Sequence, residues 1–423
     1  MMKKIGSVLK YFILSLFLFF GGVLMDADAP SGSEPVSSLI DRLDDLPDID
    51  PDIDPDIDLP DLLPDGTADK LQAEDSGVPD SPDQEESSDE NEVYQYYYTL
   101  LDAGQKEYYD QICGAVSRGE ASVELSGITQ EEADPIFLSV QYDHPEYFWL
   151  DSPYSYRSGD GFVEFIFEYN CEGAEKEKRQ REIEDQADAI IAGAPLGGDE
   201  YEKIKYVFET IVDQTDYDLS APDNQNIYSV FGNWTSVCAG YAKASKYLLD
   251  QLGVECIYVT GDASGEAHAW NIVRCDGQYY CYDATWGDPL YQEGIGVEMD
   301  TTSYEYLCCP DSMLSRTHTP DPAYTLPECT DVSLEYYRLA GRYLESSDRE
   351  AILGIMRSDI DAGEERTDIQ FASPDIYNEV IAQMDPLLNE AMQYEMEATG
   401  ASQSNISYQY NDNTCRLTVL WTK

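Results

Sequence analysis

A cysteine, a histidine and an aspartate in the middle of the chain are of the types that together perform nucleophilic acyl chemistry. Cys238 lies in the run SVCAGYAKASKYLL, which predicts a helix that begins at the cysteine and ends near Gly253. Unpaired N–H groups and the dipole at a helix start favour an anion, which lowers a thiol pKa toward the nucleophilic thiolate. The N–H of Cys238 could also stabilise an oxyanion. Taken alone, this run fits a buried structural cysteine equally well.

The segment that follows predicts a β-hairpin. Residues 266–275 and 278–286 are rich in β-forming side chains, and an Asp-Gly pair at 276–277 separates them. Asp-Gly between two such runs is a strong signal for a two-residue hairpin turn. We therefore expect Cys275 to pair with Gln278, and this pair sets the register of both strands.

This register gives a histidine an acidic partner. Counting back from the turn puts Trp270 opposite Asp283 and Thr285 opposite His268. Side chains alternate between faces, so His268 and Asp283 share a face as diagonal neighbours, roughly 7 Å apart at the backbone. The carboxylate would orient the imidazole and stabilise its charged form, which leaves the other ring nitrogen for Cys238. We therefore predict a Cys-His-Asp catalytic triad.

Three blocks, SVCAGYAKASKYLL, HAWNIV and YDATWGDP, resemble in their order and spacing the microbial transglutaminase-like superfamily, which is related to papain-type cysteine proteases. The resemblance covers about residues 201–320. It implies that Cys238 is the nucleophile, His268 the general base and acid, and Asp283 the orienting carboxylate. It also implies an α+β fold, with a transglutaminase-like, papain-related core that carries the cysteine on a helix and the other two residues on an antiparallel sheet. The flanking α+β regions look like those of exported multidomain members of bacterial origin.

Other side chains have weaker assignments. Asn233 and Trp234, in a loop before the nucleophile, could supply a further oxyanion donor, although a packing role for the tryptophan is the simpler interpretation. Trp270 shares the face of His268 and could shield the His-Asp pair from water. Trp286 is expected in the core.

The remaining histidines and cysteines do not predict a further site. His144 and His318 lack a partner pattern, so we expect them to be structural or exposed. No CxxC pair or HxxxH spacing marks a zinc site, and the adjacent Cys308 and Cys309 suit neither a zinc cage nor an unstrained disulfide. A large chain does not need a disulfide framework, and we expect no metal and no cofactor. The ten cysteines are Cys113, Cys171, Cys238, Cys256, Cys275, Cys281, Cys308, Cys309, Cys329 and Cys415.

The net charge of the chain limits its partners, and the N-terminal segment indicates its location. The net charge of -59 disfavours nucleic-acid and anionic-membrane partners, since both require a basic surface. Lys3 and Lys4 precede an apolar run at 11–25 and a small-residue string that ends at Ala29, as in a signal peptide. Pro30 after this string keeps an uncleaved membrane anchor open as the alternative. The chain is therefore expected outside the cytoplasm, secreted or anchored at the cell surface.

The remainder of the chain divides by composition. A Pro-Asp-Ile-Asp repeat at 47–58 lies in an acidic, proline-rich stretch that favours a disordered spacer over a calcium-binding repeat. We expect helices at 92–117, 130–140, 173–192, 201–212, 334–344 and 376–397, strands at 147–156, 162–169 and near 369, and a terminal hairpin at 405–421. The expected division is a signal peptide or anchor at 1–29, a linker at 30–91, an N-terminal α+β region at 92–198, a catalytic domain at 199–320 and a C-terminal α+β region at 321–423.

The triad predicts acyl transfer through a thioester, but it does not name the acceptor. With water as acceptor the enzyme is a peptidase or amidase acting on a peptide, a protein or a cell-wall or surface polymer. With a lysine amine as acceptor it is a crosslinking transglutaminase. A third possibility is a non-enzymatic surface module that binds such a polymer on the same fold. The sequence does not indicate the oligomeric state.

Overall fold

The computed structural model describes residues 93–151, 155–159, 161–288, 302–400, 402 and 405–422. All of them lie in one of two compact units of the chain, and the other unit, Asp26–Asp89, lies outside the described residues. The predicted signal or anchor and the predicted linker also fall outside them. Within the described part of the chain, no helix has the length and apolarity needed to cross a membrane.

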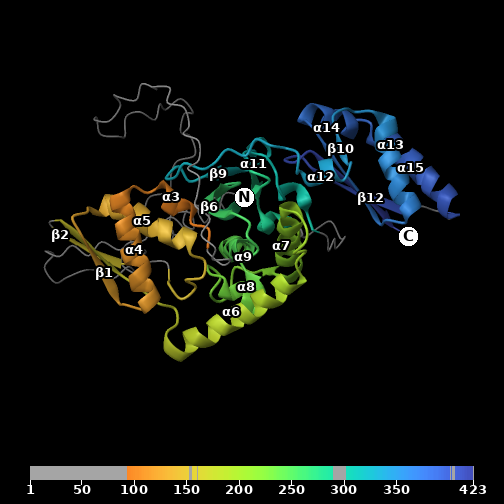
Figure 1. The fold of residues 1–423 in the computed structure, drawn as a ribbon. Helices are drawn as coiled ribbons and strands as arrows, with labels where there is room; N and C mark the ends of the chain where they lie inside the picture. The colour runs from red at the N-terminus through yellow and green to blue at the C-terminus, as the bar shows by residue number, and fades with distance from the viewer. Residues whose placement is uncertain are drawn as a thin grey trace, which may run out of the picture. The chain divides into compact units, whose positions relative to one another are not determined.

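The N-terminal region is a three-stranded antiparallel sheet with helices. Its elements are α3 (Tyr96–Leu100), α4 (Ala103–Arg118), β1 (Ser122–Ser126), α5 (Gln130–Asp143), β2 (Ser155–Gly159) and β3 (Phe162–Ile166), with strand order β1–β3–β2. Figure 1 shows α4 and α5 side by side, next to the sheet. The sheet and α5 share a core, in which the rings of Phe137 and Phe165 lie 4.8 Å apart. The α+β prediction for this region agrees with these elements.

Two details of the N-terminal prediction are wrong. The tyrosine-rich segment forms two helices instead of one, because Leu101 leaves the helical conformation and Asp102 caps α4 with a capping box to Gln105. The strand expected at 147–156 begins only at Ser155, since the chain before it turns through residues 145–149. The strand β1 was not predicted at all.

Two helices connect this region to the predicted triad. They are α6 (Gly173–Gly193) and α7 (Glu200–Gln214), and both confirm the predicted positions to within two residues. Asp199 caps α7 by accepting a hydrogen bond of 2.9 Å from the N–H of Glu202. The apolar stripe of α7 is fully buried through Ile204, Val207 and Phe208.

A helix and a four-stranded sheet form the centre of the predicted catalytic region. The elements here are β4 (Asp216–Tyr217), α8 (Tyr228–Asn233), β5 (Thr235–Ser236), α9 (Cys238–Gln251), β6 (Cys256–Ala263), β7 (Glu266–Cys275), β8 (Gln278–Tyr282), α10 (Ala284–Gly287), the 3₁₀ helix η2 (Tyr304–Tyr306), α11 (Asp311–Leu314) and β9 (His318–Pro320). The sheet is antiparallel, with strand order β8–β7–β6–β9. The hairpin prediction is confirmed, since Cys275 pairs with Gln278 and the turn residues Asp276 and Gly277 have positive φ values of 50° and 79°.

Hydrogen bonds on the buried side of helix α9 hold the helix in place. The Lys246 side chain is 1% exposed, and its ammonium donates to the backbone oxygens of Tyr94 at 2.6 Å and Cys256 at 3.0 Å. The same ammonium lies 2.9 Å from the Asp250 carboxylate. An amide N–H of Asn271 on β7 donates to the oxygen of Ala242 at 3.0 Å. These bonds fix α9 to the sheet beneath it.

The C-terminal region has a mixed sheet and a core of its own. Its elements are α12 (Tyr336–Leu339), β10 (Tyr343–Leu344), α13 (Arg349–Ala362), β11 (Arg366–Phe371), α14 (Pro374–Ile381), α15 (Met384–Thr399), β12 (Asn405–Asn411) and β13 (Arg416–Thr422), with strand order β10–β11–β13–β12. Leu353, Met356 and Leu417 are fully buried between helices and sheet. The terminal hairpin and the strand near Ile369 are confirmed.

Corrections in this region concern helices. The helix expected at 334–344 is limited to the four residues of α12, because Gly341 turns the chain with a φ of 67°. The helix expected at 376–397 is two helices, α14 and α15. Helix α13, which Asp348 caps, was not predicted.

One buried apolar cluster contains residues from both sides of the domain boundary predicted at residue 198. One apolar cluster runs from Tyr109 to Cys308 and includes Ile190 on α6 and Ile204 on α7, on the two sides of the boundary expected at 198. Residues from Ile352 to Trp421 form a separate cluster. The α+β class therefore holds throughout the described part, while the domain division remains a prediction.

Candidate active site

Cys238 is the first residue of α9, as predicted. Val237 before it is extended, with a φ of -117°, and its oxygen accepts from the N–H groups of Gly240 and Tyr241. A Cβ on Gly240 would lie 1.9 Å from the hydroxyl of Ser236, so only glycine allows this close turn into the helix. Cys238 is 7% exposed and stands at the positive end of a 14-residue helix. That position favours a thiolate.

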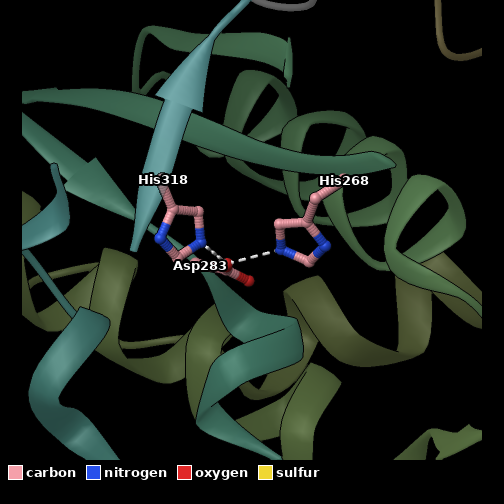
Figure 2. A group of neighbouring side chains, drawn as sticks. All are labelled: His268, Asp283 and His318. Atoms are coloured by element: carbon pink, nitrogen blue, oxygen red, sulfur yellow. Dashed lines mark hydrogen bonds and ion pairs between the residues drawn. The ribbon is translucent and has the colours of Figure 1, made fainter. Parts of the chain in front are cut away.

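His268 and Asp283 meet as the hairpin register indicated. Nε2 of His268 on β7 lies 2.8 Å from Oδ2 of Asp283, and both side chains are buried (Figure 2). The thiol of Cys238 lies close enough to His268 to contribute to the raised pKa of the imidazole. Since Nε2 faces the carboxylate, Nδ1 is the ring nitrogen left for the thiol. The structure thus brings the three residues of the predicted triad together.

One part of the register prediction is wrong. Strand β8 ends at Tyr282, which pairs with Asn271, and the chain then turns into α10. Thr285 therefore lies in this short helix and not opposite His268. Asp283 caps α10, because its Oδ1 accepts from the N–H of Trp286 at 3.1 Å. The cap holds one carboxylate oxygen, which leaves Oδ2 for the imidazole.

The charges of this pair stabilise each other. Burial alone would lower the pKa of His268, but the carboxylate of Asp283 and the thiol of Cys238 reverse that effect and raise it to about 10. Burial alone would raise the pKa of Asp283, but its bonds to His268 and His318 hold it well below its usual range. The arrangement therefore favours an imidazolium beside a carboxylate, which is the charge state that supports a thiolate.

A second histidine reaches the same carboxylate. His318 begins β9, which pairs with the far edge of β6, and its Nε2 lies 3.1 Å from Oδ2 of Asp283 (Figure 2). It is 2% exposed, so the prediction of a structural or exposed residue missed its place beside the triad. Gly261 on β6 permits this approach, because a Cβ there would lie 2.2 Å from the oxygen of Thr319. A three-residue strand leaves no periodicity in the sequence from which this contact could be predicted.

Part of the chain matches a known family. Residues 188–284, which contain Cys238, His268 and Asp283, match the family model of the transglutaminase-like superfamily. The match supports a cysteine enzyme and cysteine-dependent acyl transfer at the level of the family. No curated protein matches the chain.

Solved structures similar to this chain share little sequence with it. A transglutaminase structure is 13% identical with a TM-score of 0.25, and covers 42% of this chain and 55% of its own. A proposed cysteine protease from Cytophaga hutchinsonii is 18% identical with a TM-score of 0.22, and covers 30% and 55%. A proposed protease from Parabacteroides distasonis is 12% identical with a TM-score of 0.19, and covers 31% and 35%. The chain thus spans about half the length of the first two.

Aromatic rings surround His268 and His318. Trp270 stacks on His268 with ring centroids 6.1 Å apart, and it is 2% exposed. Trp286, which we expected in the core, packs with it in an apolar cluster but also lies 4.8 Å from His318. Tyr306 approaches the same histidine at 5.6 Å. These rings exclude water from the imidazoles, which strengthens the bonds to Asp283.

The structure gives the surroundings of the two residues expected near the oxyanion, whose role stays a prediction. Asn233 ends α8 with an exposed side chain. Trp234 adopts a left-handed φ of 54° and packs against the large core. The packing interpretation of Trp234 agrees with this position.

Tyr217 was not singled out from the sequence, but it contacts the backbone of the nucleophile. Strand β4 pairs in parallel with β5, and this places Tyr217 beside Ser236, two residues before Cys238. The phenol of Tyr217 lies near the backbone and the thiol of Cys238. Burial and that thiol raise the pKa of Tyr217 to about 12, so the phenol stays neutral. A neutral phenol is thus a neighbour of the N–H expected to stabilise an oxyanion.

His144 and the His268–Asp283–His318 group can be compared as candidate metal ligands. His144 is 8% exposed, and its Nδ1 lies 2.6 Å from Glu146, which agrees with the structural role expected for it. The donor atoms of His268, Asp283 and His318 lie within 4.8 Å of one another. The hydrogen bonds of both imidazoles to one carboxylate oxygen account for this approach without a metal ion.

Proposed function

We propose that the protein is a cysteine peptidase or amidase that acts by acyl transfer through Cys238. The observation that carries the proposal is the position of Cys238, at the start of α9, beside His268, which is hydrogen-bonded to Asp283. The fold supports it, because a helix start favours the thiolate and a buried carboxylate favours the imidazolium.

In the first step the Cys238 thiolate attacks the carbonyl carbon of a peptide-like amide. The imidazolium of His268 then donates its Nδ1 proton to the leaving amine, and a thioester remains. Asp283 keeps its contact to Nε2 throughout, which fixes the ring orientation. In the second step neutral His268 takes a proton from water, and the resulting hydroxide attacks the thioester carbonyl, which releases the acid and restores the Cys238 thiolate and the imidazolium.

The oxyanion of each tetrahedral intermediate needs hydrogen-bond donors. The N–H of Cys238 is one candidate, and the neutral phenol of Tyr217 beside it could turn its O–H toward the oxyanion as a second.

Water is the acceptor that we propose, because it needs no binding site of its own. A lysine amine as acceptor would make the protein a crosslinking transglutaminase, and this remains the second candidate, with a binding module on the same fold as the third. The strongly acidic chain favours a peptide or protein substrate and disfavours nucleic acid. The N-terminal sequence pattern supports a site of action outside the cytoplasm, either secreted or anchored.

Selective alkylation tests the nucleophile. The full chain is treated with iodoacetamide at about pH 6, where ordinary thiols are protonated, and the labelled cysteines are mapped by mass spectrometry. We expect Cys238 to react faster than the half-buried Cys113. The variant His268→Ala should remove this advantage. Equal rates at Cys238 and Cys113 in the unmodified protein would rule out the ion pair.

The acceptor is tested separately. A library of quenched fluorescent peptides reports hydrolysis, and a glutamine peptide offered with and without a primary amine reports transfer. Cleavage in water that Cys238→Ala abolishes supports the peptidase. Incorporation of the amine without cleavage supports crosslinking. If Cys238→Ala leaves the activity of the protein in cells unchanged, the binding module is favoured.

A further inference from the structure

Three thiols that are far apart in the sequence converge on one carboxylate. Cys281 on β8 forms an antiparallel bridge with Cys309, each donating its N–H to the oxygen of the other, at 2.8 and 3.0 Å. Cys329 arrives from the loop after β9, where its oxygen accepts from the N–H of Asp311 at 2.8 Å. All three cysteines are at most 1% exposed. Backbone pairing therefore holds the cluster together independently of the side chains.

Three side chains of this cluster lie close to one another. The Cys281 thiol donates to Oδ1 of Asp311 at 3.4 Å. Ligand atoms of Cys281, Asp311 and Cys329 lie within 4.8 Å of one another. In a tetrahedral zinc site with Zn–S bonds of about 2.3 Å, neighbouring sulfurs are about 3.8 Å apart. Three donors are thus already gathered, and Cys309, which pairs with Cys281 through the backbone, would turn its thiol toward them to complete the set.

The carboxylate distinguishes a metal site from a disulfide. A disulfide uses two sulfurs and gains nothing from a carboxylate against them. Here the N–H of Cys329 holds Oδ2 of Asp311 at 2.7 Å and leaves Oδ1 directed at Cys281. A second-shell bond of this kind orients a ligating carboxylate. Three sulfurs and one oxygen also complete the four positions of a structural zinc ion.

We propose that Cys281, Cys309, Cys329 and Asp311 bind one Zn²⁺ ion. The spacing rules that argued against zinc in the sequence apply to ligands on local turns, whereas these ligands come from separate segments. Binding of a divalent cation by three thiols would release three protons.

The cavity beside the cluster provides a path for the ion. It has a volume of about 380 Å³, and its lining includes Cys281, Asp311, Trp270 and His318. The ion would also have a structural effect on the transglutaminase-like site. Cys281 lies two residues before Asp283, and Asp311 begins the helix that leads to His318, so one ion would fix both segments. The proposal does not depend on the reaction that the triad performs.

Metal content of the purified full chain tests the proposal. The protein is expressed with added zinc under reducing conditions, dialysed, and analysed by mass spectrometry for bound metal. We expect one Zn²⁺ per chain. Cys329→Ser and Asp311→Asn should each lower the bound zinc severalfold, and Asp311→Asn keeps the size of the side chain should the cysteine variant fail to fold. Cys113→Ser, at a half-buried thiol outside the cluster, should retain the ion.

Cobalt substitution counts the thiolates. Co²⁺ in place of Zn²⁺ should give a near-ultraviolet band from thiolate ligands, and Cys309→Ser should reduce it by about one third, because one of three sulfur ligands is lost. A cluster without zinc that contains a Cys281–Cys329 or Cys281–Cys309 disulfide in peptide mapping would overturn the proposal. Zinc that persists in both Cys329→Ser and Asp311→Asn would also overturn it.

Discussion

His268 and His318 reach the same oxygen of Asp283 from two different strands, yet their surroundings give them different roles. His268 stands on β7, 2.8 Å from the carboxylate, and its ring lies beside the thiol of Cys238. His318 stands on the edge strand β9 at 3.1 Å, and its Nδ1 lies 2.8 Å from the hydroxyl of Thr317. The two histidines share one carboxylate oxygen, so the partner of the other ring nitrogen is what distinguishes their roles. We propose His268 as the proton carrier and His318 as a positioning residue.

The largest expected effect is that of His268→Ala. Loss of the base leaves Cys238 without a proton partner, and removal of such a residue lowers kcat by roughly 10⁶-fold in the best-studied hydrolase triads. Steady-state cleavage of the best library peptide measures this, with circular dichroism to confirm folding. If His318→Ala were to cost more than His268→Ala, the two roles would have to be exchanged.

Asp283→Asn should have the next largest effect. The amide can still cap α10 through its oxygen, but it cannot accept from both imidazoles and favours the wrong tautomer of His268. In a triad of this type the same change costs about 10⁴-fold in kcat. The measurement is kcat with KM recorded separately. A variant with the activity of the unmodified protein would show that the carboxylate only supports the fold.

His318 offers a smaller and more selective test. His318→Leu removes one bond to Asp283, worth about 1 kcal/mol, and should lower kcat about tenfold with little change in KM. His318→Gln keeps an N–H donor at a similar position and should recover most of the loss. Equal losses in the two variants would mean that His318 acts through packing with Trp286 and not through the hydrogen bond.

The smallest expected effect is on how the free energy of unfolding depends on pH. The pKa of His268 is raised from 6.5 to about 10 in the folded chain, so its contribution to the free energy of unfolding is complete below pH 6.5 and is lost as the pH rises through about 10. Between these values the free energy should fall by at most about 1.4 kcal/mol per pH unit. Urea unfolding at a series of pH values measures the slope, and His268→Gln should flatten it. An identical slope in that variant would exclude His268 as its source.

The low pKa of Asp283 makes stability depend on pH in the opposite direction. Its contribution is present above its unfolded value of 3.8 and is lost only as the pH falls through the lower folded value. The two groups together place the most stable range of the site in mildly acidic to neutral solution.

The part of the site that depends on local rules could be predicted from the sequence. The turn at Asp276 and Gly277 fixes the register of the hairpin, and the helix start at Cys238 follows from the apolar pattern after it. The hairpin rule failed only at Thr285, where Asp283 caps a new helix instead of continuing the strand. Local hydrogen bonding decided between two structures that the same residues allow.

The parts that depend on distant segments could not be predicted. His318 and Tyr217 lie on strands of three and two residues, which are too short to leave a pattern, and their pairing partners are set by the whole fold. The same holds for Cys281 and Cys329, whose contact depends on the loop after β9. In the N-terminal region, α3 and α4 separate at a cap that the tyrosine pattern concealed.

The buried ammonium of Lys246 has a consequence for how the protein can move. It ties α9 to the backbone of Tyr94 near the start of the described chain and to Cys256 on the central sheet, so the helix cannot shift without breaking two hydrogen bonds of a buried ammonium. The amides of α9 should therefore exchange with deuterium only through global unfolding. Adaptation to a new substrate would then have to come from the surrounding loops, while the helix that carries Cys238 stays in place.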